Sequence, residues 1–343
     1  MKRINLALQG GGAHGAFTWG VLDRLLEVDD LEIAAITGTS AGALNGAALK
    51  AGMVENGRAG AKAKLDWLWG QVGAVTDMRL ASWMAAISPT PGAISKAIEY
   101  SLPFSMIDGA SRMFSPYTYG PFYENPLRRI VSQFRYEKVC ANEGPKLHIC
   151  ATNVRSGKIR VFDERDITTD AVLASACLPT MFQALEIYDP KTERMEAYWD
   201  GGYTGNPALF PLFTPDLPGD LVVVNINPLH REELPLTAQD IQNRINEISF
   251  NSSLLRELRA IEFVQRLLAD GTLQPGSMKE IYVHMIADDA LMNELSVATK
   301  LVPSPFVLGE LKSAGRAAAQ VFLDRDLEKV GSESSVDLPK MFN

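Results

Sequence analysis

Residues 33–51 read IAAITGTSAGALNGAALKA, and this stretch decides the fold. Ile33–Thr37 is a short apolar run, which indicates a buried strand. Gly38-Thr39-Ser40-Ala41-Gly42 follows as a turn, and residues 43–51 read as a helix of small residues. A strand, a tight turn and a helix in this order favour the α/β class.

The same order occurs once before this stretch. Ile4–Leu8 is an apolar run, a glycine loop over residues 10–15 follows it, and Ala16–Val28 carries apolar residues at helical spacing. Two such units predict a mostly parallel sheet that helices cover. Downstream we expect strands at residues 147–151, 158–162, 221–226 and 281–286, helices at 171–176, 238–270 and 306–326, and a loose tail at 331–343.

The charge balance argues against one class of partner. The chain has 33 Lys and Arg residues against 41 Asp and Glu residues, which gives a formal net charge of −8. An acidic protein gains little from a polyanion, so we expect no nucleic acid partner. The same charge weakens attraction to anionic lipid, so any transient contact with a membrane surface should rest on apolar side chains.

Cysteine usage and hydropathy bear on location. The three cysteines form no C-x-x-C pair, and their odd number does not suggest a disulfide framework or a zinc site. The first apolar run is too short for the core of a signal peptide, and no run reaches the roughly 18 apolar residues of a spanning helix. We expect a cytoplasmic protein that is peripheral to the membrane where it meets lipid.

Residues 79–123 differ in composition from the rest of the chain. They are rich in proline, methionine and aromatic residues, carry few charges and show no single period. We expect short helices and loops that form a cap or a lipid-access segment over a pocket. Ordinary core packing is the alternative for the same composition.

Ser40 is the candidate nucleophile. It lies at the centre of a G-x-S-x-G pattern between an apolar strand and a small-residue helix, which is the context of a nucleophile elbow. Gly38 and Gly42 let the backbone bend tightly and let a substrate approach. The helix that follows directs amide N–H groups toward negative charge that develops near the serine.

The glycine run before the first helix is the candidate oxyanion hole. The backbone amides of Gly10, Gly11 and Gly12 are not shielded by side chains, and two such N–H groups can bind an oxyanion. The pattern Gly10-x-Gly12-x-x-Gly15 also matches the dinucleotide fingerprint, so a nucleotide-binding module is an alternative. That alternative leaves Ser40 and its turn unexplained.

A base must serve Ser40, and the residues leave two kinds of candidate. An α/β-hydrolase on small soluble esters would use a late histidine, which points to His230 or His284. Asp200-Gly201-Gly202 offers a carboxylate on a glycine-flanked turn after two aromatic residues. A carboxylate in a partly apolar pocket has a raised proton affinity, which suits it to accept the serine proton.

Taken together, three motifs resemble the patatin-like phospholipase family: the glycine loop, the Ser40 turn and Asp200-Gly201-Gly202, in that order. The resemblance implies a three-layer α/β/α fold and a Ser40–Asp200 dyad without histidine. It implies hydrolysis of phospholipid or other acyl-ester lipid through an acyl-enzyme, with the glycine loop amides as oxyanion hole and with no metal and no cofactor. Ala174-Ser175 also resembles a family segment that packs beside the site. A non-catalytic interaction protein with a degenerate site is the remaining alternative.

Two further features concern the family pattern. Many members carry arginine where this chain has His14, although a bacterial branch often has histidine there. The charge of His14 would depend on pH, and a buried structural role is the alternative to support of catalysis. The chain after residue 229 resembles an extension of bacterial members. We therefore expect a catalytic core at residues 1–229 and a largely helical extension at 230–343 that packs on it.

Overall fold

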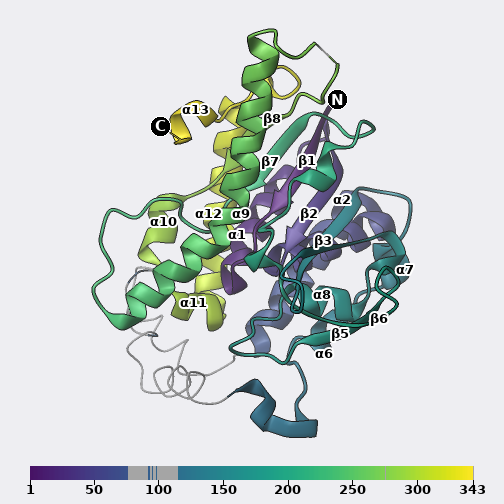
Figure 1. Cartoon of the computed structure of the whole chain (residues 1–343), viewed down its shortest axis with the longest axis vertical. Coiled ribbons are helices and arrows are strands. Elements are labelled where there is room, and N and C mark those ends of the chain that lie inside the picture. Colours follow the sequence, from purple (N-terminus) through teal and green to yellow (C-terminus); the bar gives the residue numbers. More distant parts are fainter. Residues whose placement is uncertain (76–91, 93–94, 96–97, 99–114, 275, 343) are drawn as a thin grey trace.

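The computed structural model describes residues 1–75, 92, 95, 98, 115–274 and 276–342 (Figure 1). The described residues form an eight-stranded sheet in the order β5-β6-β3-β2-β1-β7-β8, and β4 also pairs with β3. The strands are β1 Lys2–Leu8, β2 Leu31–Thr39, β3 Lys146–Asn153, β4 Ile159–Asp163, β5 Leu185–Asp189, β6 Arg194–Asp200, β7 Asp220–Val224 and β8 Tyr282–Ile286. Strands β3, β2, β1, β7 and β8 run parallel, which confirms the expected mostly parallel sheet.

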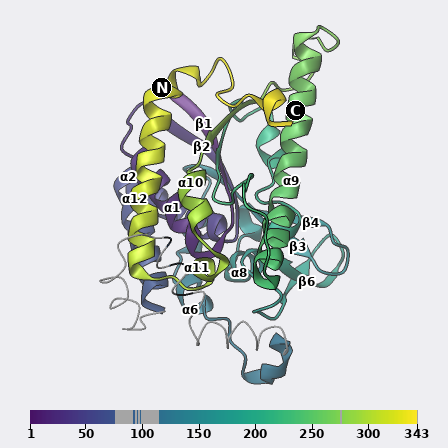
Figure 2. The ribbon, with the colours of Figure 1, turned by 90° about the vertical axis from the view of Figure 1, so that its left-hand side faces the viewer.

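Helices cover both faces of the sheet (Figure 2). On one face lie α1 Gly15–Leu25, α2 Ala41–Val75 and α12 Pro305–Arg325, and on the other lies α9 Ala238–Ala269. Alternate residues of β1 serve the two faces, because side chains along a strand point to opposite sides. Leu6 belongs to the core under α1 and α2, whereas Ala7 belongs to the core that Leu254 and Leu258 of α9 close. The three-layer α/β/α architecture is thereby confirmed.

The other described helices are short. They are α6 Arg128–Val131, α7 Tyr136–Val139, α8 Thr169–Ser175, α10 Asp289–Glu294, α11 Val297–Leu301 and α13 Leu338–Phe342. None of the helices that the structure describes has both the length and the hydropathy that crossing a bilayer requires. The expected cap at residues 79–123 lies mostly outside the described residues.

Residues 230–343 share the sheet and the core with residues 1–229. Strand β8 pairs with β7, and α12 packs so closely on α1 that a Cβ on Gly315 would overlap the carbonyl oxygen of Phe17. The expectation of a loose tail is wrong for part of it, because Leu338 is buried against the α9 side of the sheet and begins α13. The division at residue 229 stays a prediction.

Candidate active site

Ser40 lies at the turn between β2 and α2. Its φ is +54°, in the left-handed region that residues other than glycine rarely adopt, and it is 9% exposed. Strain of this kind is typical of a nucleophile elbow, where the turn holds the hydroxyl group outside the helix. Gly38 and Gly42 flank it as expected, and a Cβ on Gly42 would overlap the carbonyl oxygen of Leu8. The turn therefore packs directly on the end of β1.

Asp200 reaches Ser40 because two strands end beside the same neighbour. Strand β4 occupies one edge of β3, so β2 and β6 share the other edge. Strand β2 ends with Thr39 opposite Cys150, and β6, which runs the other way, ends with Asp200 opposite Ala151. The carboxyl ends of β2 and β6 therefore meet, and the residues at these ends lie side by side.

The carboxyl group of Asp200 is buried beside the Ser40 turn. Asp200 is 1% exposed, and its Oδ1 accepts the N–H of Gly202 at 2.8 Å. Burial raises the pKa of Asp200 to about 7, against the lowering effects of the Gly202 N–H and the Ser40 side chain. A side chain on Gly201 would overlap the carbonyl oxygen of Cys150. The result is a carboxylate that is a far stronger base than an exposed one.

Two polar side chains hold the backbone around Ser40. The Oγ of Ser175, at the end of α8, accepts the N–H of Ser40 at 2.9 Å. The Ala174-Ser175 segment therefore lies beside the turn, as the resemblance to the family implied. The Oδ1 of Asn206 accepts the N–H of Gly10 at 2.7 Å. Sequence reasoning missed Asn206, because an Asn-Pro dipeptide is an ordinary turn signal and its partner lies 196 positions away.

The glycine loop lies against Ser40. A Cβ on Gly10 would stand 2.7 Å from the Cβ of Ser40, so the loop and the turn are in direct contact. The N–H of Gly10 is engaged by Asn206 and is not free for an oxyanion. Within the described residues, the N–H groups of Gly11 and Gly12 donate no hydrogen bond, and Gly12 is exposed. Of the three expected amides, these two have no acceptor among the described residues, and Gly11 is buried, so their role as the oxyanion hole stays a prediction.

His14 is buried behind the loop rather than presented to a substrate. It is 1% exposed, and its Nε2 lies 2.8 Å from the Oγ1 of Thr299. Burial first, and then the charges of Lys300 and Arg231, hold the pKa of His14 well below its usual 6.5. A neutral imidazole at neutral pH supplies no fixed positive charge, so the structure favours the structural role for this residue.

Neither late histidine is free to serve Ser40. His230 is exposed, and its Nε2 lies 3.1 Å from Glu232. Both ring nitrogens of the buried His284 are engaged, one by Ser335 at 3.1 Å and one by Asp220 at 3.2 Å. The structure therefore gives the histidine alternative no support.

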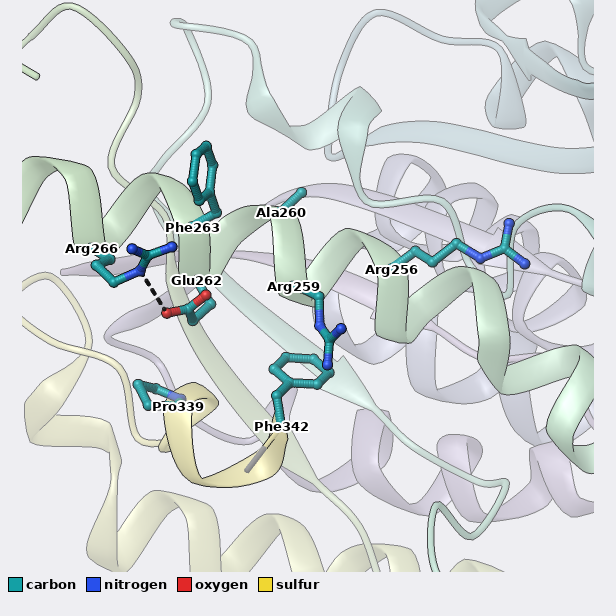
Figure 3. Close-up of a pocket in the computed structure, with 8 residues that line it drawn as sticks. All are labelled: Arg256, Arg259, Ala260, Glu262, Phe263, Arg266, Pro339 and Phe342. Atoms are coloured by element: carbon teal, nitrogen blue, oxygen red, sulfur yellow. Dashed lines mark ion pairs between the residues drawn. The ribbon is translucent and has the colours of Figure 1, made fainter.

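A surface pocket of about 540 Å³ lies apart from this site (Figure 3). It is formed by one side of α9 together with α13, and the guanidinium of Arg259 stands over the ring of Phe342 at 4.7 Å. Arg266 pairs with Glu262 at 3.5 Å along the same helix. No expected site residue lines it, so it is not the candidate active site.

Known proteins resemble this chain in sequence and in structure. The family model of the patatin-like phospholipases matches residues 6–213. VipD from Legionella pneumophila is similar in structure, with 16% sequence identity, a TM-score of 0.42 and coverage of 94% of this chain and 67% of that chain. The ExoU–SpcU complex of Pseudomonas aeruginosa gives 14% identity, a TM-score of 0.31 and coverage of 93% and 52%, so the chain spans about half of that protein. A search of curated proteins found no significant match.

Proposed function

Because the chain belongs to the patatin-like phospholipase family, a family of lipid acyl hydrolases, we propose that Ser40 is its nucleophile and Asp200 its base. The proposed substrate is a phospholipid or another acyl-ester lipid, met in transient contact with a membrane surface. The observation that carries the proposal is the position of Ser40, just after the end of β2, beside the buried carboxyl group of Asp200 at the end of β6, whose pKa is about 7.

Acylation follows from these positions. The hydroxyl oxygen of Ser40 attacks the ester carbonyl carbon while Asp200 accepts the hydroxyl proton. The carbonyl oxygen becomes an oxyanion that the N–H groups of Gly11 and Gly12 stabilise. When the tetrahedral intermediate collapses, the ester C–O bond breaks, the leaving oxygen takes the proton from Asp200, and the acyl group stays on Ser40.

In deacylation, water is the nucleophile and the oxygen of Ser40 is the leaving group. Asp200 accepts a proton from water as the water oxygen attacks the acyl carbon, and the same two amides hold the second oxyanion. The bond to Ser40 then breaks, Ser40 regains its proton from Asp200, and a fatty acid leaves. The protein groups end the cycle as they began it, so no further reactant is needed.

Covalent labelling tests the nucleophile directly. A fluorophosphonate should add once to the folded protein, because only an activated serine attacks its phosphorus at a useful rate. Intact-mass and peptide mass spectrometry should locate the adduct on Ser40. Ser313, exposed on α12 without a carboxylate partner, serves as the internal control and should stay unlabelled. A folded protein that takes no label, or takes it on another serine, would contradict the proposal.

The dyad also sets the acidic side of the pH profile. Below a pH of about 7 the carboxyl group of Asp200 is protonated and cannot accept the proton of Ser40, so kcat/KM should rise with pH through that value. The measurement is kcat/KM for a soluble short-chain ester from about pH 5 to about pH 9 at constant ionic strength. A flat profile on the acidic side would exclude Asp200 as the base.

A further inference from the structure

The entrance to the glycine loop is held by a side-chain network at the end of β7. The Nδ2 of Asn227 donates to the carbonyl oxygen of Gly10 at 2.8 Å and to the Oε1 of Gln9 at 3.1 Å. The same Oε1 accepts the backbone N–H groups of Ile226 and Asn227 at 2.9 and 3.1 Å. Gln9 and Asn227 are fully buried, so this network fixes where the loop leaves β1.

Lys300, on α11, contacts this loop from two directions. Its Nζ donates to the Oδ1 of Asn227 at 2.9 Å, which is the remaining polar atom of that amide. Its backbone carbonyl lies so close to Gly12 that a Cβ there would overlap it. The Oδ1 of Asn227 would lie 3.6 Å from a Cβ on Gly11. Lys300 thus contacts Gly12 through its backbone and lies near Gly11 through its hydrogen bond to Asn227.

The charges around Lys300 do not cancel. Glu247, on α9, forms ion pairs with Arg231 at 2.7 Å and with Arg244 at 3.2 Å. Among the described residues, no carboxylate lies within ion-pair distance of Lys300. Three cations therefore face one carboxylate in a chain whose net charge is −8. His14, at the end of the glycine loop, lies within reach of these charges: burial first, and then Lys300 and Arg231, lower its pKa.

We propose that Lys300 is a positioning residue of the oxyanion loop. Through Asn227 it holds residues 10–12 in the conformation that keeps the amides of Gly11 and Gly12 free. Its ammonium group adds positive potential where the oxyanion forms, in a site of low dielectric where a charge acts strongly. The inference rests on the proposed Ser40–Asp200 chemistry and assigns to the C-terminal part of the chain a role in it.

The charge of Lys300 is itself titratable. Burial lowers its pKa to about 8, an effect that Glu247 opposes and Arg231 reinforces. The charged and titratable groups that interact with it are Glu247 from α9, Arg231 from the segment after β7 and His14 from the glycine loop, and Arg244 pairs with the same Glu247. The wild-type kcat should therefore fall again as pH rises through about 8.

Three variants test the inference. Lys300→Met removes the donor and the charge, so kcat for a soluble ester should fall by about tenfold to about a hundredfold, less than the loss of a direct oxyanion donor. KM should change little, because Lys300 acts on the transition state rather than on the bound ester. Lys300→Arg keeps the charge at every accessible pH and should restore much of kcat while moving the alkaline decline upward. Lys312→Met, on α12 and away from the loop, is the control and should match the wild type.

The outcomes separate this inference from the proposed function. An active wild type with Ser40 labelled, together with a Lys300→Met variant that keeps the wild-type kcat and alkaline decline, would overturn the inference alone. A wild type that is neither labelled nor active would overturn the function. If Lys300→Met does not fold by circular dichroism, the alkaline decline of Lys300→Arg decides: an unchanged decline contradicts the role of the charge.

Discussion

The variant Ser40→Ala should lose almost all hydrolytic activity, with kcat/KM reduced by about 10⁴-fold or more. Alanine has no oxygen to form the acyl-enzyme, and Asp200 then has no proton to accept. The change should leave the fold intact, because alanine is smaller than serine and meets the same left-handed φ at this turn. The measurement is kcat/KM on phospholipid vesicles and on a soluble short-chain ester, with release of fatty acid as the readout.

Ser313→Ala is the matched control for Ser40→Ala. Ser313 is exposed on α12 and donates to the carbonyl oxygen of Gly309 in the same helix, so its loss should change neither activity nor melting temperature. If the Ser40→Ala variant kept a tenth or so of the wild-type rate on either substrate, a mechanism through a serine acyl-enzyme would have to be abandoned.

Replacement of Asp200 with asparagine should cost nearly as much. The amide keeps the shape of the side chain and still accepts the N–H of Gly202, but it cannot take a proton from Ser40. We expect kcat/KM to fall by about 10³-fold to about 10⁴-fold. KM for the soluble ester should stay close to the wild-type value, since the carboxylate acts on the proton and not on the bound acyl chain.

The same variant has an expected effect on stability that a merely misfolded protein would not show. The folded pKa of about 7 lies above the ordinary 3.8, so the carboxyl group favours folding when protonated and loses that contribution as pH rises toward 7. Asparagine stays neutral throughout. The melting temperature of Asp200→Asn, measured relative to wild type, should therefore increase between about pH 4 and about pH 7 and level off above it.

Asp216→Asn is the control for Asp200→Asn, because Asp216 is exposed and pairs with Lys146 at the surface. It should leave kcat/KM unchanged. A different pattern would favour another enzyme class: activity that survives Asp200→Asn but is abolished by His230→Ala or His284→Ala would indicate a histidine-dependent hydrolase.

Part of the fold could be predicted because its signals are local. The apolar runs before the two glycine-rich turns became β1 and β2, and the β-branched run after residue 220 became β7. Strand β6, which ends in Asp200, was missed. Its central Glu196 is buried against Arg155 and Arg194, so a charge stands where a strand pattern would show an apolar residue. One of the two arginines that pair with Glu196, Arg155, lies outside β6, so the sequence of the strand alone does not reveal that the charge is neutralised.

The sequence by itself determined which candidate catalytic groups are present: Ser40 on a tight turn, a glycine run and Asp200 on a glycine-flanked turn. Only the tertiary structure decided how they are used. It brought the ends of β2 and β6 together along β3, buried the carboxyl group of Asp200 and engaged the amide of Gly10 with Asn206. Local patterns report backbone preference over a few residues, whereas burial and hydrogen bonds across 196 positions exist only when the whole sheet has formed.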